Sequence, residues 1–148
     1  MKILYTAEAT ASGGRLGGVH TSDGKLDLTL DPPAELGGPE DGGSNPEQLF
    51  AAGYAACFHS ALLIIARGKK LDADDSSVTA RVGFGPLGDG PGWGLTVNLQ
   101  VDVPHLDQDA AQRLAERAHR QCPYSNAIEG NVPVELEVTA GSALTSPA

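Results

Sequence analysis

The sequence predicts an α+β fold in which antiparallel strands surround one buried helix and one amphipathic helix. Three observations support this class. Apolar and polar residues alternate in several segments, as they do in half-buried strands. One long apolar segment and one amphipathic segment have helical spacing. The length of 148 residues with 41% hydrophobic content predicts one domain over residues 1–148.

The first thirty residues are expected to form strands and tight turns. Ile3 and Tyr5 alternate with Lys2, Leu4 and Thr6, and residues 19–21 and 26–30 flank a strong hairpin turn at Asp23 and Gly24. A glycine-rich bend over residues 12–18 holds Arg15, a long cationic side chain among residues with little bulk. Residues 31–44 are too rich in Pro and Gly for a regular element and predict a long crossing loop.

The central helix is predicted over residues 46–67. Ser44 or Asn45 can cap its N-terminus, and Pro46 suits the first turn, where a missing N–H has no cost. Apolar residues occur nearly all round this segment, so we expect it to be covered on most sides. Its interruption by Gly53, His59 and Ser60 favours a core helix over a membrane span.

The second half of the chain alternates strands with one further helix. Strands are predicted over residues 78–84, 95–103 and 132–138, and residues 85–94 form a glycine-rich connection with the single Trp. Asp107 can cap a helix that runs to about Gln121 and ends before Pro123. Its buried stripe is expected to be Ala111, Leu114, Ala115 and Ala118. Residues 141–148 predict a loose polar tail.

The charge of the chain excludes several partners. With 10 Lys and Arg against 19 Asp and Glu, the formal charge is −9, and no basic run suits nucleic acid or an anionic membrane. No secretory leader is apparent, so a cytoplasmic, reducing compartment is expected. Since a chain of this length needs no disulfide framework, its two cysteines are available for chemistry.

The two cysteines admit two interpretations. Cys57 lies within the central helix, where a lone Cys is most often a small packing residue. Cys122 lies at a helix end before Pro123, at a position expected to be accessible and adjustable. If the two thiols meet in space, they form a reactive thiolate and a resolving partner. If they do not, each is inert packing.

Arg15 and Glu47 are candidates for activating a thiolate. Arg presents a planar fork that can hold a carboxylate and stabilise a sulfur anion, which would lower the pKa of Cys57. Alternatively, Arg15 is a solvated loop cation and Glu47 completes a capping box with Ser44. Glu47 and Cys57 are ten positions apart, about 15 Å along a straight helix, so an extended Arg or a second subunit must complete such a site.

Several distinctive motifs occur along essentially the whole chain: residues 45–58 (NPEQLFAAGYAACF), 122–127 (CPYSNA), 130–131 (GN), 22–28 (SDGKLDL), 35–38 (ELGG) and the glycine-flanked Arg15. Together they resemble the organic hydroperoxide resistance subgroup of the Ohr/OsmC family. Tyr54 and Tyr124 favour this subgroup over the OsmC division of the family.

This resemblance implies an OsmC-like fold, an intertwined homodimer with sites at the subunit interface, and a thiol peroxidase. Cys57 would be the peroxidatic cysteine and Cys122 the resolving cysteine, with Arg15 and Glu47 as the activating pair. The substrate would be an alkyl or fatty acid hydroperoxide, and no bound cofactor is implied. The reductant would be an external dithiol, dihydrolipoamide or a lipoylated protein, instead of thioredoxin.

An apolar wall would favour alkyl hydroperoxides, because each buried CH₂ of a substrate contributes about 0.8 kcal/mol. The candidates for this substrate-binding wall are Leu16, Phe50, Tyr54, Phe58 and Trp93, each of which could equally be ordinary packing.

Two other functions are alternatives to the peroxidase. Cys57, His59, His119 and Cys122 could in principle form a zinc set, although positions two apart on a helix point away from each other. We therefore expect no metal. The other alternative is a binding protein of the same fold in which both cysteines only pack.

Overall fold

A computed structural model describes residues 1–141 of the chain. The tail predicted over residues 141–148 therefore lies outside the described residues, apart from Gly141. The chain divides into two compact units, Met1–Leu49 and Phe50–Ala148.

The first unit contains a small antiparallel sheet. Its strands are β1 (Ala9–Ser12), β2 (Gly18–Thr21) and β3 (Asp27–Thr29), in the order β1-β2-β3. The hairpin turn is confirmed: Gly24 has a φ of 73°, and the Asp23 carboxylate accepts hydrogen bonds from the Thr21 hydroxyl and the Lys25 N–H. The crossing loop is also confirmed, with one 3-10 turn, η2 (Ala34–Leu36).

The prediction of a strand near residues 2–6 is wrong. This segment forms no regular structure, and Ile3, Leu4 and Tyr5 are exposed. Alternation alone does not make a strand, because its backbone groups need a neighbouring strand to bond with. More generally, the described residues of this unit bury only Leu30 and Asn45, so its sheet has no hydrophobic core of its own.

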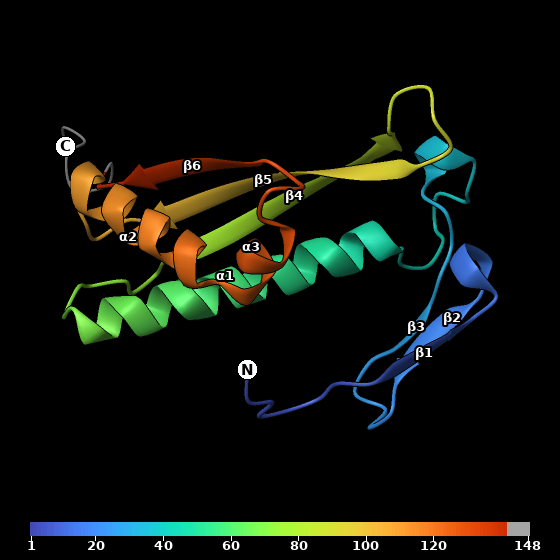
Figure 1. Ribbon diagram of the computed structural model, residues 1–148, viewed down its shortest axis with the longest axis horizontal. Helices are drawn as coiled ribbons and strands as arrows, with labels where there is room; N and C mark the ends of the chain where they lie inside the picture. Colours follow the sequence, from blue (N-terminus) through green and yellow to red (C-terminus); the bar gives the residue numbers. More distant parts are fainter. Residues whose placement is uncertain (142–148) are drawn as a thin grey trace. The chain divides into compact units, whose positions relative to one another are not determined.

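The second unit contains a larger sheet, shown in Figure 1. Its strands are β4 (Ser77–Pro86), β5 (Trp93–Val103) and β6 (Val134–Ala140). The β4–β5 pair is antiparallel as predicted, whereas β6 pairs parallel to β5. The long helical connection between β5 and β6 makes this parallel pairing possible, since a short hairpin can join only antiparallel strands.

The predicted loop over residues 85–94 is shorter than expected. Gly85 pairs with Gly94 and Pro86 pairs with Trp93, so the ladder continues through the glycines and the connection shrinks to residues 87–92. Trp93 consequently belongs to a strand and stacks on Phe84, with ring centroids 5.1 Å apart.

The helices lie where the sequence predicts them. They are α1 (Pro46–Gly68), α2 (Gln108–Gln121) and a short α3 (Pro123–Ile128) that the sequence did not reveal. Asn45 is the cap of α1, because its side-chain oxygen accepts the Gln48 N–H at 2.9 Å. Asp107 caps α2 in the same way, through the Ala110 N–H at 2.8 Å.

One face of α1 packs in the core of the second unit, together with β5 and α2. Figure 1 shows the helices on the same side of the β4-β5-β6 sheet. The largest fully buried side chains include Tyr54, Phe58, Leu62, Leu99 and Leu114, and the predicted stripe of α2 is buried throughout. By length and composition α1 could also cross a membrane, but its buried face is that of a core helix.

The expectation that α1 is covered on most sides is wrong for the single chain. Ile64 is 67% exposed and Leu63 is 37% exposed, although both are apolar. Periodicity shows where apolar residues lie on a helix, but it does not show what covers them.

Candidate functional site

The fold brings the two cysteines together. Cys57 lies on α1, one turn beyond Tyr54, and Cys122 lies at the junction where α2 ends and α3 begins. The thiols are neighbours: Cys122 lies close enough to raise the pKa of the Cys57 thiol, and both are unbridged. The first of the two interpretations of the cysteines, in which the thiols meet, therefore describes this chain.

The two thiols differ in their exposure to solvent. Cys57 is partly exposed, whereas Cys122 is completely buried in the core. The expectation that Cys122 is accessible is therefore wrong. A helix end can be buried where another element covers it, and α3 begins at the next residue and turns the chain back toward α1.

The environment within this unit opposes ionisation of Cys57. Burial raises the pKa of the Cys57 thiol most, the Tyr124 backbone N–H lowers it, and Cys122 raises it again through its charge and a hydrogen bond. Desolvation disfavours the anion because a thiolate loses water without gaining a cation. A positive group is thus what this sulfur needs to become nucleophilic near neutral pH.

Aromatic rings lie beside the thiols. The ring of Tyr124 lies 5.7 Å from that of Tyr54 and 6.2 Å from that of Phe50, measured between centroids. A side chain at Gly53 would meet the Tyr124 hydroxyl at 2.7 Å, so the absent Cβ lets α3 approach α1. Of the wall candidates, Phe50 and Tyr54 therefore belong to one aromatic cluster with Tyr124.

The other wall candidates lie elsewhere. Phe58 is fully buried and packs near the ring of His119. Trp93 is 64% exposed on β5, and Leu16 is 77% exposed in the 3-10 turn η1 (Gly14–Leu16) of the first unit.

A chain of hydrogen bonds fixes α3 beside the thiols. The buried Ser125 hydroxyl bonds to the Tyr54 hydroxyl at 2.6 Å and to His119 Nδ1 at 2.8 Å. Burial raises the pKa of the Tyr54 phenol, and the bond to Ser125 lowers it. No role was predicted for Ser125 from the sequence. The signal available was its place three residues after Cys122, one helical turn along.

We expect Ser125→Ala to destabilise the protein. The substitution leaves the fully buried Tyr54 hydroxyl without its partner, which costs about 1–3 kcal/mol. Urea unfolding followed by circular dichroism measures this loss. The matched control is Ser60→Ala, since the exposed Ser60 hydroxyl bonds only to the Ala56 carbonyl. Equal stability of the two variants would contradict a structural role for the Ser125 hydroxyl.

In the first unit, Arg15 and Glu47 form a bidentate ion pair. Nη1 donates to Oε2 at 2.8 Å and Nη2 donates to Oε1 at 2.5 Å. The bond to Arg15 lowers the pKa of Glu47, and the bond to Glu47 raises that of Arg15. The alternative interpretations of these residues, a capping box of Ser44 with Glu47 and a solvated loop cation at Arg15, do not hold. Asn45 is the cap of α1, and Arg15 is paired with Glu47.

The glycines around Arg15 are required by the backbone. Gly13 has a φ of 79°, and a Cβ on Gly17 would lie 1.7 Å from the Ser12 carbonyl oxygen. The bend can therefore close only without side chains at these positions. It presents the Arg15 side chain from a tight 3-10 turn.

The zinc set is not assembled. Among residues 1–141, no group of three His, Cys, Asp or Glu side chains could hold a metal ion. His59 instead bonds to the Ser76 hydroxyl at 3.0 Å, while His119 bonds to Ser125.

Comparison with known proteins identifies the class. Residues 38–137 match the family model described as OsmC-like protein. The chain belongs to the OsmC-like family, as the resemblance of its sequence motifs predicted.

Within that family, the chain is similar to proteins named for organic hydroperoxide resistance. One from Xanthomonas axonopodis pv. citri (strain 306) is 48% identical over 136 residues, which cover 91% of this chain and 94% of that protein. The OhrB protein of Bacillus subtilis (strain 168) is 43% identical and covers 91% of this chain and 98% of its own length.

Solved structures agree. The organic hydroperoxide resistance protein of Elizabethkingia anophelis superposes with a TM-score of 0.89 at 47% identity, covering 95% of this chain and 99% of that one. Bacillus subtilis OhrB superposes with a TM-score of 0.84 at 42% identity, covering 93% and 100%. The resemblance predicted from the motifs is thereby confirmed.

Proposed function

We propose that this protein detoxifies organic hydroperoxides as a thiol-dependent peroxidase, acting on alkyl or fatty acid hydroperoxides. The names of its relatives support the class of substrate. The observation that carries the chemistry is the contact between a partly exposed thiol and a buried one. A binding protein would have no need of two adjacent unbridged thiols.

The reaction is a two-electron oxidation of sulfur. The Cys57 thiolate attacks one peroxide oxygen, the O–O bond breaks, and the alkoxide leaves as an alcohol after taking up a proton. Cys57 is left as a sulfenic acid, which excess peroxide would oxidise further. The Cys122 thiol then condenses with it, and the Cys57–Cys122 disulfide forms with release of water. An external dithiol, dihydrolipoamide or a lipoylated protein, reduces this disulfide and becomes oxidised itself.

Arg15 would supply the positive charge that Cys57 lacks, with Glu47 holding its guanidinium in position. The bidentate geometry supports this proposal, because it fixes both the direction of the side chain and its charge. The hydrocarbon part of the substrate would contact the aromatic cluster of Phe50, Tyr54 and Tyr124. Leu16, Phe58 and Trp93 remain predictions for this wall.

The working unit would be a homodimer in the cytoplasm. Two features support a second copy: the sheet of the first unit has no core, and Leu63 and Ile64 leave an apolar face of α1 uncovered. Small sheets of this kind are marginal without a surface to pack on. A reducing compartment suits a resting state with two free thiols.

Turnover of tert-butyl hydroperoxide with dihydrolipoamide, compared with thioredoxin, tests the proposal. We expect sustained turnover with dihydrolipoamide. Free thiols should fall from two to zero per chain after one equivalent of peroxide, without disulfide-linked dimers. If both thiols persist, the protein is a binding module in which the cysteines only pack.

Cys122→Ser should allow a single turnover and then stall. Without a resolving thiol, the Cys57 sulfenic acid has no partner and proceeds to sulfinic acid in excess peroxide. Intact-mass spectrometry would record a gain of one oxygen at equimolar peroxide and of two at excess. The matched control is Ser60→Ala, which should turn over as the wild type does. Sustained turnover by Cys122→Ser would remove Cys122 from the mechanism.

A further inference from the structure

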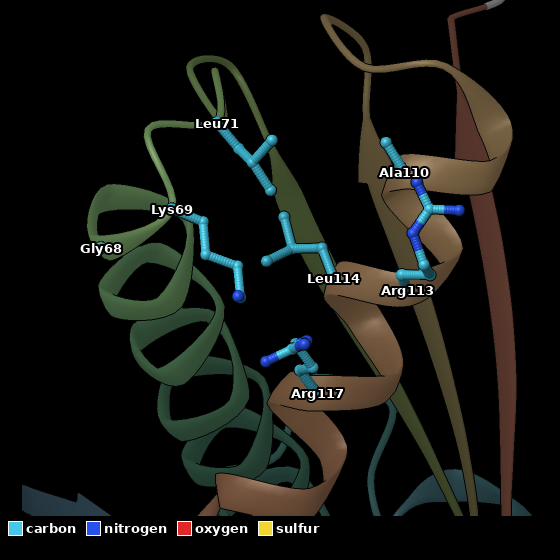
Figure 2. A pocket seen from close by; sticks show the side chains of 7 residues that line it. All are labelled: Gly68, Lys69, Leu71, Ala110, Arg113, Leu114 and Arg117. Atoms are coloured by element: carbon cyan, nitrogen blue, oxygen red, sulfur yellow. The ribbon is translucent and has the colours of Figure 1, made fainter.

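A pocket of about 530 Å³ lies in the second unit, between the end of α1 and residues 110–117 of α2. Its lining combines apolar and cationic side chains and includes neither cysteine. The residues that line it are Gly68, Lys69, Leu71, Ala110, Arg113, Leu114 and Arg117. In Figure 2, Lys69 and Arg117 point into the space between the helices, and Leu71 and Leu114 project beside them.

The concentration of positive charge here is unusual for this chain. The protein has a formal charge of −9, yet six of its ten Lys and Arg fall within residues 67–70 and 113–120. Three of the six line the pocket. Within residues 1–141, none of these three side chains forms an ion pair or a hydrogen bond.

Helix stability explains only part of this arrangement. A cation just after α1, such as Lys69, complements the negative end of that helix. Arg113 and Arg117, however, lie one turn apart on α2, where like charges repel. Asp109 lies one turn before Arg113 at a spacing that suits an ion pair, but the structure forms none there. Arg113 and Arg117 are therefore exposed cations with no ion-pair partner among the described residues of this unit.

We propose that this pocket binds the carboxylate of an aliphatic acid. Lys69 and Arg117, whose side chains point into the space between the helices in Figure 2, would hold the carboxylate, since the guanidinium fork of Arg117 matches its two oxygens, and Arg113 would add positive charge at the rim. Leu71, Leu114 and Ala110 would contact the hydrocarbon chain, because apolar surface gains by leaving water. The pocket volume of about 530 Å³ lies within the range of about 300–1,000 Å³ that is typical of small-molecule sites.

Octanoate is a suitable probe, with two matched compounds that each lack one half of it. Acetate keeps the carboxylate without the chain, and 1-octanol keeps the chain without the charge. We expect octanoate to bind the full-length protein at least about tenfold more tightly than either, as measured by calorimetry and by shifts in amide NMR signals of α2. Raising the salt concentration should weaken the binding of octanoate and leave the binding of 1-octanol unchanged.

The double variant Arg113→Gln/Arg117→Gln should bind octanoate with an affinity lower by about tenfold or more. Both arginines are exposed, so the fold should persist, which circular dichroism checks. The matched control is Arg67→Gln, an exposed cation near the same helix end that does not line the pocket. Equal binding of octanoate to wild type and double variant would overturn the proposal, as would acetate or 1-octanol binding as tightly as octanoate. Because no peroxide is used, the result is independent of the proposed peroxidase activity.

Discussion

Replacing Cys57 by Ser should abolish hydroperoxide turnover. A serine hydroxyl is not ionised near neutral pH and cannot form a sulfenic acid, so neither the attack nor the disulfide is available. Steady-state reduction of tert-butyl hydroperoxide with dihydrolipoamide measures the loss, which should be complete within the detection limit.

The fold should survive this substitution, because Cys57 is only partly buried and Ser is nearly isosteric. Near-UV circular dichroism of the variant therefore serves as the control for folding. A second comparison is Cys57→Ala, which removes the side-chain oxygen as well. Normal turnover by either variant would show that Cys122 or another group attacks the peroxide.

Arg15→Ala should slow peroxide reduction by about 10- to 1,000-fold. An opposite charge near an ionisable group shifts its pKa by about 1–3 units, and the thiolate fraction falls tenfold for each unit. Within its own unit, the Cys57 thiol has a raised pKa. Removing the cation should therefore move the alkylation profile of Cys57 to higher pH.

The rate of alkylation by iodoacetamide against pH tests this directly, in a Cys122→Ser background so that one thiol reports. Arg15→Lys separates charge from geometry: we expect it to keep part of the shift and to lose the bidentate hold on Glu47. Arg81→Ala is the matched control, because Arg81 is an exposed arginine that bonds to Gln100. An unchanged profile for Arg15→Ala would exclude Arg15 as the activating cation.

Local signals in the sequence were sufficient for much of the fold. Asp107, Pro46 and the Asp23–Gly24 turn act through neighbours within four residues, so the helix starts and the hairpin followed from short motifs. The same kind of reasoning left Ser44 and Asn45 open as the cap because two capping residues stand side by side, and the hydrogen bond from the Gln48 N–H to the Asn45 side chain selects Asn45.

Properties that depend on distant segments were harder to predict. Nothing near Cys122 in the sequence indicates that it is buried, because α1 and the sheet supply the cover. The parallel pairing of β6 with β5 is equally invisible in an alternating pattern. The ion pair of Arg15 with Glu47 spans 32 residues, and residue chemistry alone left it as one of several alternatives.

The contrast in exposure between the two sulfurs has a consequence for kinetics. If a disulfide joins them with this packing, an incoming dithiol can collide only with the sulfur of Cys57, and Cys122 is the leaving group. Oxidant and reductant would then enter through the same opening. High concentrations of the electron donor should compete with the peroxide, so the enzyme would work fastest at an intermediate ratio of the two.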